Sequence, residues 1–248
     1  MSFKDHFSIP ASAYAQARPG YPAELFAALA EAAPDRALAW DAGSGNGQAA
    51  IGLAAHFDRV VATEPSEAQL REAKAHPQVA YHCVAETAPM LAPASVALAT
   101  AAQAAHWFDL DRYYGEVRRV VRPGGVVAIW TYELCRIAPA IDAIVDRFYR
   151  YEVGPYWPPE RRHCESGYRE MPFPFPELPF PAAEMRLGWD LGALLAYVGT
   201  WSAVIRYRQA RGTDPLPRLA DELGRAWGDP TTVRRAVWPI SGRMGRLA

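Results

Sequence analysis

Three glycines at alternate positions, Gly43, Gly45 and Gly47, follow Asp41 at the end of a short apolar run. Glycine lets a turn take positive φ and lets a ligand approach the backbone where a Cβ would collide. The dinucleotide fingerprint GxGxxG would require a glycine at position 48, which is Gln48 here. This departure disfavours a pyrophosphate ligand. The acid before the glycines suits a ligand that carries an ammonium and a sulfonium better than it suits a diphosphate.

A second acidic residue, Glu64, follows the apolar run RVVAT at 59–63. An acid at the end of the second parallel strand can accept hydrogen bonds from both ribose hydroxyls of a bound nucleoside. NAD and other adenosine-containing ligands need the same contact, so Glu64 alone does not distinguish among them.

Apolar runs alternate with segments of helical length through the first 131 residues. Such alternation indicates a parallel sheet covered on both faces, and right-handed crossovers then favour a doubly wound α/β fold. Strands are predicted at 37–40, 59–63, 79–83, 96–100 and 125–131. Helices are predicted from Pro22 and at 46–55, 66–75 and 111–121.

The region 154–181 interrupts this alternation because it is rich in proline and aromatic residues. Proline neither continues a helix nor donates to a sheet, and the many aromatics imply packing, so we expect an ordered, extended insertion. Helices at 191–200 and 216–227 and a last strand at 233–239 are predicted after it. We expect this appendage to lie over the carboxyl ends of the strands, where ligands of such folds bind.

The composition narrows the function classes. The 248 residues carry a net charge of -1, and half are hydrophobic, which argues against nucleic acid and anionic membranes as partners. The three cysteines are dispersed and form no CxxC pair, so we expect neither a disulfide scaffold nor a metal site. Neither a signal peptide nor a membrane-spanning run is evident, which favours a cytoplasmic small-molecule enzyme or binding protein.

The chain resembles the class I S-adenosylmethionine-dependent methyltransferases, and in particular the subgroup around trans-aconitate methyltransferase, also called methyltransferase type 11. Its N-terminal stretch YAQARPGYP resembles the lid of that subgroup, and GTWSAVIRYRQARGTDPL resembles its C-terminal helices. The remaining motifs that carry the resemblance are DAGSGNG (41–47) with Glu64, CVAETAP (83–89), TAAQAAHWFD (100–109) and RPGGVVAIWTY (122–132).

The resemblance covers nearly the whole chain and implies a seven-stranded, mostly parallel Rossmann-like sheet with an α-helical and proline-rich cap. The implied divisions are an N-terminal lid and first helix at 1–34, a cofactor-binding core at 35–150, and the insertion, cap and last strands at 151–248.

The resemblance also implies S-adenosyl-L-methionine as cofactor and S-adenosyl-L-homocysteine as product. Asp41 and the glycine loop would hold the methionine moiety, Glu64 the ribose, and Arg18 the cofactor carboxylate. Gln103 follows the fourth strand, where the methyl group points toward the acceptor. The full implied cofactor set is Tyr14, Arg18, Asp41, Gly43, Ser44, Gly45, Gly47, Glu64, Pro65, Ala85, Glu86 and Gln103.

The methyl acceptor decides whether a general base is needed. A carboxylate needs none, whereas a phenol, hydroxyl or amine is helped by one, and His106 is the best-placed candidate. The alternative is a structural histidine beside Trp107 and Phe108. Candidate acceptor-binding residues are Tyr21, His106, Trp107, Trp130, Tyr132, Trp201 and Arg206, although each aromatic could equally belong to the core of the cap.

Taken together, we expect a methyltransferase for a small-molecule acceptor, with trans-aconitate-like O-methylation of a carboxylate as one candidate reaction. Two alternatives stay open. One is a catalytically silent S-adenosylmethionine-binding regulatory protein. The other is an NAD-dependent oxidoreductase, which Gln48 and Asp41 disfavour. We expect a cytoplasmic monomer or homodimer with no nucleic-acid or membrane partner.

Overall fold

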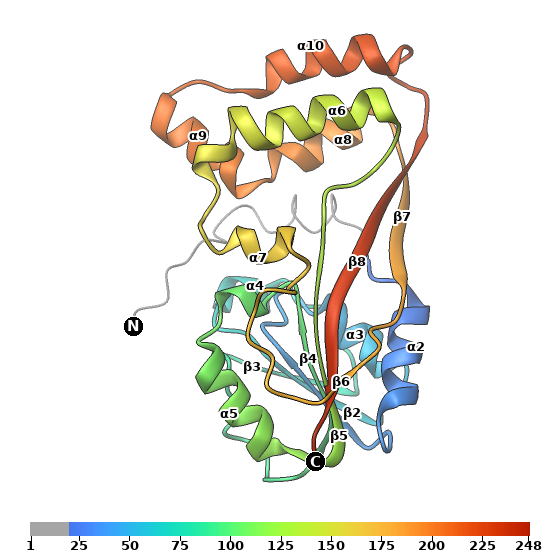
Figure 1. The fold of residues 1–248 in the computed structure, drawn as a ribbon, viewed down its shortest axis with the longest axis vertical. Coiled ribbons are helices and arrows are strands. Elements are labelled where there is room, and N and C mark those ends of the chain that lie inside the picture. Colours follow the sequence, from blue (N-terminus) through green and yellow to red (C-terminus); the bar gives the residue numbers. More distant parts are fainter. Residues whose placement is uncertain (1–19) are drawn as a thin grey trace.

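The structure is a computed structural model that describes residues 20–248. Its central sheet has eight strands in the order β3-β2-β1-β4-β5-β8-β6, with β7 also paired to β8 (Figure 1). The first five strands are parallel, and β6, β7 and β8 pair antiparallel. The strands are β1 (Leu38–Ala42), β2 (Arg59–Thr63), β3 (Val79–His82), β4 (Val96–Ala102), β5 (Val121–Tyr132), β6 (Glu177–Leu178), β7 (Ala183–Trp189) and β8 (Arg234–Arg246).

This topology confirms the doubly wound α/β class. The chain moves outward from β1 through β2 to β3, and then returns to place β4 on the other side of β1. The strand order therefore reverses between β1 and β4, and a crevice opens outside the carboxyl ends of strands at such a point. The count exceeds the seven strands implied by the resemblance because β6 and β7 both pair with the long β8.

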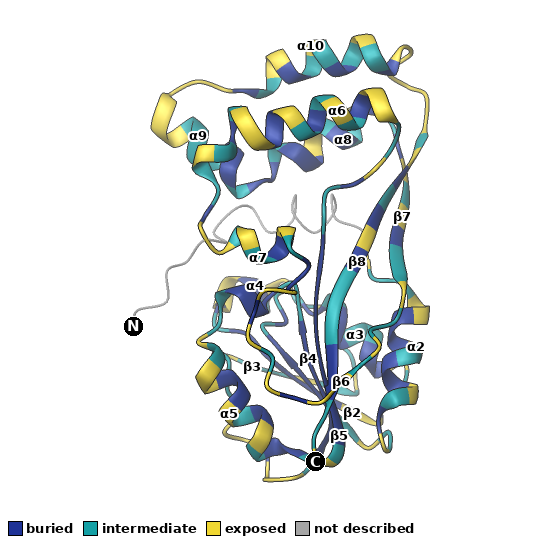
Figure 2. Cartoon of the chain, in the orientation of Figure 1, coloured by how far each residue is buried: buried dark blue, intermediate teal, exposed yellow. Residues whose placement is uncertain are grey.

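Both faces of the sheet are buried, as expected for parallel strands with continuous apolar runs. Helices α2 (Ala23–Ala32) and α3 (Gln48–Ala54) lie on one face, and α5 (Leu110–Val120) lies on the other (Figure 1). A hydrophobic core lies on each face of the sheet, and successive residues of β5 point into opposite cores. Trp130 packs on the face covered by α2 and α3, and Ile129 packs on the face covered by α5. The central strands β1, β2, β4 and the second half of β5 are therefore almost continuously buried, whereas β3, β7 and β8 are partly exposed and the outer helix surfaces face solvent (Figure 2).

A separate layer of helices lies above the carboxyl ends of the parallel strands (Figure 1). It contains α6 (Pro139–Arg147), α8 (Leu191–Gly199), α9 (Ser202–Arg211) and α10 (Leu216–Trp227). We call these four helices the cap. The antiparallel pair β7 and β8 connects the cap to the sheet, and the ring of Trp238 on β8 packs edge-on against Trp189 on β7 with centroids 4.6 Å apart.

Short elements fill the connections between the larger ones. They are α4 (Glu67–Arg71), η1 (Ala105–Trp107), η2 (Phe148–Glu152), η3 (Gly154–Tyr156) and α7 (Arg161–Glu165). Within residues 20–248, no helix combines the length and apolar content that crossing a bilayer requires.

The proline-rich region is ordered and packed, as its aromatics indicated, but it does not stay over the strand ends. Helix α7 lies near η1, whereas Phe173 and Phe175 pack on Tyr114 of α5, with ring centroids 6.1 and 5.3 Å away. The later part of the region therefore covers the α5 face. The alternating prolines leave no helical or strand periodicity in this region. Its path over the sheet is therefore determined by these tertiary contacts.

The predicted boundaries are least accurate in the C-terminal half. Helices α6 and α9 and strand β7 were not predicted, and β8 extends to Arg246 instead of ending at 239. Helix α4 ends at Arg71, four residues earlier than predicted. These elements depend on partners distant in sequence, since β8 completes its hydrogen bonds with β5 and β7.

Candidate active site

The glycine loop connects β1 to α3 directly above the end of β2. Gly43, Gly45 and Gly47 have φ of +65°, +55° and +87°, the left-handed region that favours glycine. The backbone N–H groups of Gly43 and Ser44 donate to the Thr63 carbonyl at 2.8 and 3.0 Å. The loop is therefore anchored to β2.

The three glycines are needed for different reasons. A Cβ on Gly43 would lie 2.6 Å from the Cβ of Ala104, and one on Gly47 would collide with the Tyr81 hydroxyl. A Cβ on Gly45 would meet only the Gln69 Oε1, at 3.9 Å. Gly43 and Gly47 thus permit packing, whereas Gly45 keeps space open in front of the loop.

Glu64 lies just after β2 and holds this loop in place. Its Oε2 accepts a hydrogen bond from the Gly45 N–H, and its Oε1 accepts one from the Ser66 N–H, both at 2.9 Å. The side chain is buried, with 7 % of the residue exposed. The two hydrogen bonds hold the carboxylate at the wall of the cavity between the glycine loop and the start of the segment after β2.

Asp41 lies beneath the loop and is fully buried. Its Oδ1 accepts from the Thr100 hydroxyl at 2.9 Å, but its Oδ2 has no hydrogen-bond partner among the described residues. Burial raises the pKa of Asp41 to about 7; the Thr100 hydrogen bond lowers it and the charge of Glu64 raises it. A buried carboxylate oxygen without a partner is costly, which indicates that a donor or cation belongs near it.

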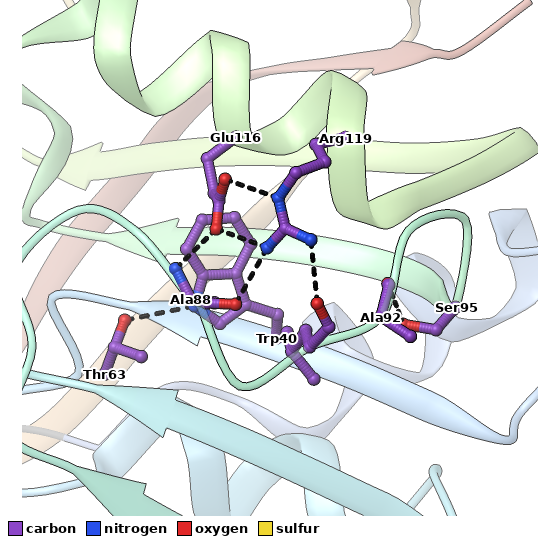
Figure 3. A network of polar contacts seen from close by, with 8 residues as sticks. Trp40, Thr63, Ala88, Ala92, Ser95, Glu116 and Arg119 are labelled. Carbon is purple, nitrogen blue, oxygen red and sulfur yellow. Dashed lines mark hydrogen bonds and ion pairs between the residues drawn. The ribbon is translucent and has the colours of Figure 1, made fainter.

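Helix α5 positions the loop that follows β3 (Figure 3). Glu116 accepts from the Ala88 N–H at 2.8 Å, and Arg119 donates to the carbonyls of Ala88 and Leu91. Glu116 and Arg119 also pair with each other at 2.7 Å. These hydrogen bonds hold residues 88–91, which follow the cavity-lining residues Ala85 and Glu86.

One cavity brings these pieces together at the carboxyl ends of β1, β2 and β4. It includes eight of the residues that the sequence associated with the cofactor and three associated with the acceptor. The lining residues are Tyr21, Gly43, Ser44, Gly45, Asn46, Gln48, Ala49, Glu64, Pro65, Gln69, Ala85, Glu86, Ala102, Gln103, Ala104, Trp107, Phe108 and Tyr132.

Two predicted cofactor residues do not line this cavity, and two lie outside the described residues. Asp41 lies under the loop, and Gly47 begins α3 with its Cβ position turned toward Tyr81. Tyr14 and Arg18 fall in the part of the chain that is not described. The Glu86 carboxylate lines the cavity and lies 3.5 Å from Arg112.

Gln103, at the end of β4, adopts a backbone conformation rare for its residue type. Its φ is +56°, and its N–H donates to the Trp130 carbonyl at 2.8 Å. The side-chain Oε1 accepts from the Thr131 hydroxyl at 2.6 Å and from the Tyr132 N–H at 3.1 Å. Left-handed backbone at such a residue is commonly found at functional sites.

The residues predicted for the acceptor are divided by the fold. Tyr21, Trp107 and Tyr132 line the cavity. Trp130 is fully buried behind Tyr21, with ring centroids 5.6 Å apart, and Trp201 packs inside the cap against Tyr149 at 5.7 Å. Arg206 is half-buried on α9 and is not among the lining residues.

His106 is also absent from the cavity lining. Its residue is buried, and its Nδ1 lies 2.7 Å from the Tyr168 hydroxyl and 3.5 Å from the Cys164 sulfur. Burial, with smaller contributions from the charges of Arg161 and His163, lowers the pKa of His106 to about 3. This geometry matches the structural alternative better than a general base facing a ligand.

Comparison with known proteins identifies the family. The Methyltransferase domain model matches residues 40–129. A methyltransferase of Dictyostelium discoideum is 32 % identical over 229 residues, covering 91 % of this chain and 87 % of its own. A solved type II methyltransferase from Anaeromyxobacter dehalogenans is 52 % identical, with a TM-score of 0.87, covering 92 % of this chain and 97 % of its own.

The chain belongs to the class I S-adenosylmethionine-dependent methyltransferases. A methyltransferase structure from Anabaena variabilis has a TM-score of 0.55 at 18 % identity, covers 90 % of this chain and 99 % of its own, and shares the fold alone. The family implies S-adenosylmethionine as the methyl donor of this methyltransferase.

The residues of this methyltransferase fit such a cofactor. S-adenosylmethionine supplies a methyl group on a positively charged sulfur and also carries an ammonium, a carboxylate and a ribose. The buried Oδ2 of Asp41 without a described partner is chemically suited to a cationic neighbour. The open space before Gly45 would be filled by a Cβ, so a close backbone approach is available to a ligand there.

Sequence reasoning missed several lining residues of the methyltransferase cavity: Asn46, Gln48, Ala49, Gln69, Ala102, Ala104 and Phe108. Of these residues, Gln69 carried a usable signal. Ser66, the predicted N-cap, accepts from the Gln69 N–H at 3.4 Å, and this cap directs the first turn of α4 toward the glycine loop. Ala102 and Ala104 have no functional group that a sequence could reveal. They line the cavity because they are the neighbours of Gln103 in the chain.

Proposed function

We propose that this methyltransferase transfers a methyl group from S-adenosylmethionine to a small-molecule carboxylate, as in the trans-aconitate methyltransferases that its sequence resembles. The observation that carries the proposal is the mixed lining of one cavity. The cavity is lined by the glycine loop and Glu64 and also by the aromatic side chains of Tyr21, Trp107 and Tyr132. The loop and Glu64 suit a nucleoside with an amino-acid group, and the aromatic side chains suit a partly apolar acceptor.

In this proposal, each element of the cofactor has a partner of suitable chemistry. Asp41 and the loop 43–47 hold the methionine group, with Ser44 in the cavity wall. Glu64 accepts two backbone hydrogen bonds, and its carboxylate, which lines the cavity, is suited to accept from the two ribose hydroxyls. Pro65 and Ala85 flank the adenine. Tyr14 and Arg18, outside the described residues, remain proposed partners from the N-terminal stretch.

The cap supports a small acceptor over a macromolecule. Its helices lie above the carboxyl ends of the strands (Figure 1), the end of the sheet at which the lining residues Gly45, Glu64 and Gln103 follow their strands. A folded protein or a nucleic-acid duplex would have to enter beneath this layer. The net charge of -1 also provides no overall attraction to a polyanion.

The cofactor half of the proposal is tested by calorimetric titration of the purified protein with S-adenosylmethionine, S-adenosylhomocysteine and NAD. We expect micromolar binding of the first two and none of NAD. The acceptor half is tested by incubation with labelled S-adenosylmethionine and trans-aconitate or cinnamate, followed by mass spectrometry for a methyl ester. Binding of NAD in place of the other two would overturn the cofactor assignment. Cofactor binding with turnover only on amines or phenols would overturn the carboxylate assignment.

A further inference from the structure

The orientation of the Gln103 side-chain amide is determined by its neighbours. Its Oε1 accepts from the Tyr132 backbone N–H, which can only donate, and from the Thr131 hydroxyl. An inverted amide would place its NH2 group against the Tyr132 N–H, donor against donor. The Gln103 Oε1 therefore faces β5, and the Nε2 points away from that strand.

The amide nitrogen of Gln103 consequently faces the cavity as a donor. Gln103 is one of the lining residues, and its Nε2 donates to no residue of the described chain. The left-handed φ of +56° turns the side chain out of the β4 direction and into this position. Backbone strain at a polar cavity residue is retained where the surroundings determine it, as two hydrogen bonds and the Trp130 carbonyl do here.

Among the described lining residues, those next to Gln103 in the chain or on β5 carry neither a carboxylate nor an imidazole: they are Ala102, Ala104, Trp107 and Tyr132. The two lining carboxylates, Glu64 and Glu86, follow β2 and β3, and Glu86 lies 3.5 Å from Arg112. Glu64 lies after β2, two strands away across β1, and its oxygens are bonded to the Gly45 and Ser66 N–H groups. Strand spacing alone puts about 10 Å between these positions.

We propose that Gln103 positions the acceptor by donating an Nε2 hydrogen bond to one oxygen of its carboxylate, and that this end of the cavity selects acceptors that need no deprotonation. The inference rests on the proposed function and adds to it the residue that sets the acceptor class. The second carboxylate oxygen forms the new O–CH3 bond as the S–CH3 bond breaks. That bonding pair stays on sulfur, the carboxylate becomes a neutral methyl ester, and no proton moves.

The test substitutes Gln103 so that its donor is lost or reversed. Gln103→Met removes the donor at similar volume. Gln103→Glu keeps an oxygen for Thr131 and Tyr132 but puts a second, charged oxygen where Nε2 was. Each variant is titrated with S-adenosylhomocysteine, and then with cinnamate or its neutral amide, cinnamamide, in the presence of saturating S-adenosylhomocysteine. Gln209→Glu, on the exposed surface of α9, controls for the change in net charge.

We expect Gln103→Met to weaken cinnamate binding about tenfold. Gln103→Glu should weaken it further while improving the binding of cinnamamide, because the amide can donate to the new carboxylate. A reversal of preference between acid and amide is not produced by a purely structural role. Gln209→Glu should leave both affinities unchanged.

Two outcomes would overturn the inference without touching the cofactor assignment. One is normal S-adenosylhomocysteine binding with the same acid-to-amide preference in Gln103→Glu as in the wild type. The other is that neither cinnamate nor trans-aconitate binds the wild-type complex. If Gln103→Glu unfolds, Thr131→Val is the second test, because it removes one of the hydrogen bonds that orient the Gln103 amide. This variant should weaken cinnamate binding but not S-adenosylhomocysteine binding. Failure of the wild type to bind S-adenosylhomocysteine would instead contradict the proposed function itself.

Discussion

The Gly45 N–H donates to the Glu64 carboxylate at 2.9 Å, joining the loop after β1 to the residue after β2. This bond crosses the edge of two neighbouring strands and closes one wall of the cavity. The same carboxylate accepts from the Ser66 N–H, so Glu64 organises the backbone on both sides of itself. A residue expected to bind ribose therefore also shapes the site in which the ribose would lie.

Glu64→Gln should weaken S-adenosylhomocysteine binding at least tenfold, although the side chains are nearly isosteric. Both Glu64 oxygens accept from backbone N–H groups, so the amide nitrogen of Gln must face one of these donors. Calorimetric titration measures the loss. Glu67→Gln is the matched control, because Glu67 is an exposed side chain whose ion-pair partner within residues 20–248 is Arg71. Equal affinities for the two variants would contradict the role of Glu64.

Gly45→Val should abolish S-adenosylhomocysteine binding while leaving a folded protein. Its side chain would project into open cavity space, and the left-handed φ would cost about 1–2 kcal/mol. Gly45→Ala should show the same effect in milder form. Titration gives the affinity, and thermal melting gives the stability.

Two other glycines serve as comparisons for Gly45. Gly124→Ala has a φ of +73° and no atom within 4 Å of the new Cβ, so it incurs the backbone cost without occupying the site. Gly43→Ala should lower the melting temperature most, because its Cβ would lie 2.6 Å from Ala104. Normal binding by Gly45→Val would show that the cofactor does not approach this loop.

Asp41→Asn should stabilise the ligand-free protein at alkaline pH and weaken cofactor binding. The folded-state pKa of Asp41, about 7, lies above its ordinary value. The stability linked to the protonated group is present below about pH 4 and is lost as pH rises through 7. The variant escapes this loss, so its advantage should grow from pH 5 to pH 8, toward an upper limit of about 4 kcal/mol.

Urea unfolding of both proteins across that pH range, without ligand, measures this difference. Asn at position 41 retains an oxygen for the Thr100 hydroxyl, so the comparison isolates the charge. A stability difference independent of pH would show that Asp41 does not titrate in this window. Unchanged S-adenosylmethionine affinity would show that its charge does not serve the ligand.

His106→Gln should reduce stability more than catalysis. The ring is buried against Tyr168 and Cys164, and disrupting this contact should cost about 1–3 kcal/mol. Because burial lowers the pKa of His106 to about 3, its contribution to stability is present above about pH 6.5 and is lost as pH falls toward 3. The variant should therefore lose stability less steeply than the wild type on acidification.

The catalytic prediction for His106 is checked in the same variant. If it only supports the structure, the pH dependence of kcat/KM at saturating cofactor should keep its shape. His56→Gln, at the end of α3, is the histidine control. Loss of the rate by 100-fold or more, at temperatures where the variant is folded, would restore His106 as a base.

Local sequence determined the parallel core and the glycine-loop wall of the cavity. Continuous apolar runs of strand length indicate strands that are buried on both faces. The glycines after Asp41 indicate a turn with positive φ. Both features act over a few residues, so Gly45 and Glu64 were predictable without knowledge of the remaining fold. The crevice between β1 and β4 follows from the order of the elements.

Only the tertiary structure decided which of the residues predicted for the acceptor line the cavity. Gln103 could be placed after β4 from the sequence, but its direction depends on Thr131 and Tyr132 of the neighbouring strand. His106 faces Tyr168, 62 residues away, instead of the cavity. Trp130 and Trp201 are aromatic like Trp107, yet the first lies in the sheet core and the second in the cap. An aromatic side chain is apolar enough either to line the cavity or to pack in the hydrophobic core. Only the long-range packing of the sheet, α7 and the cap decides which of the two it does.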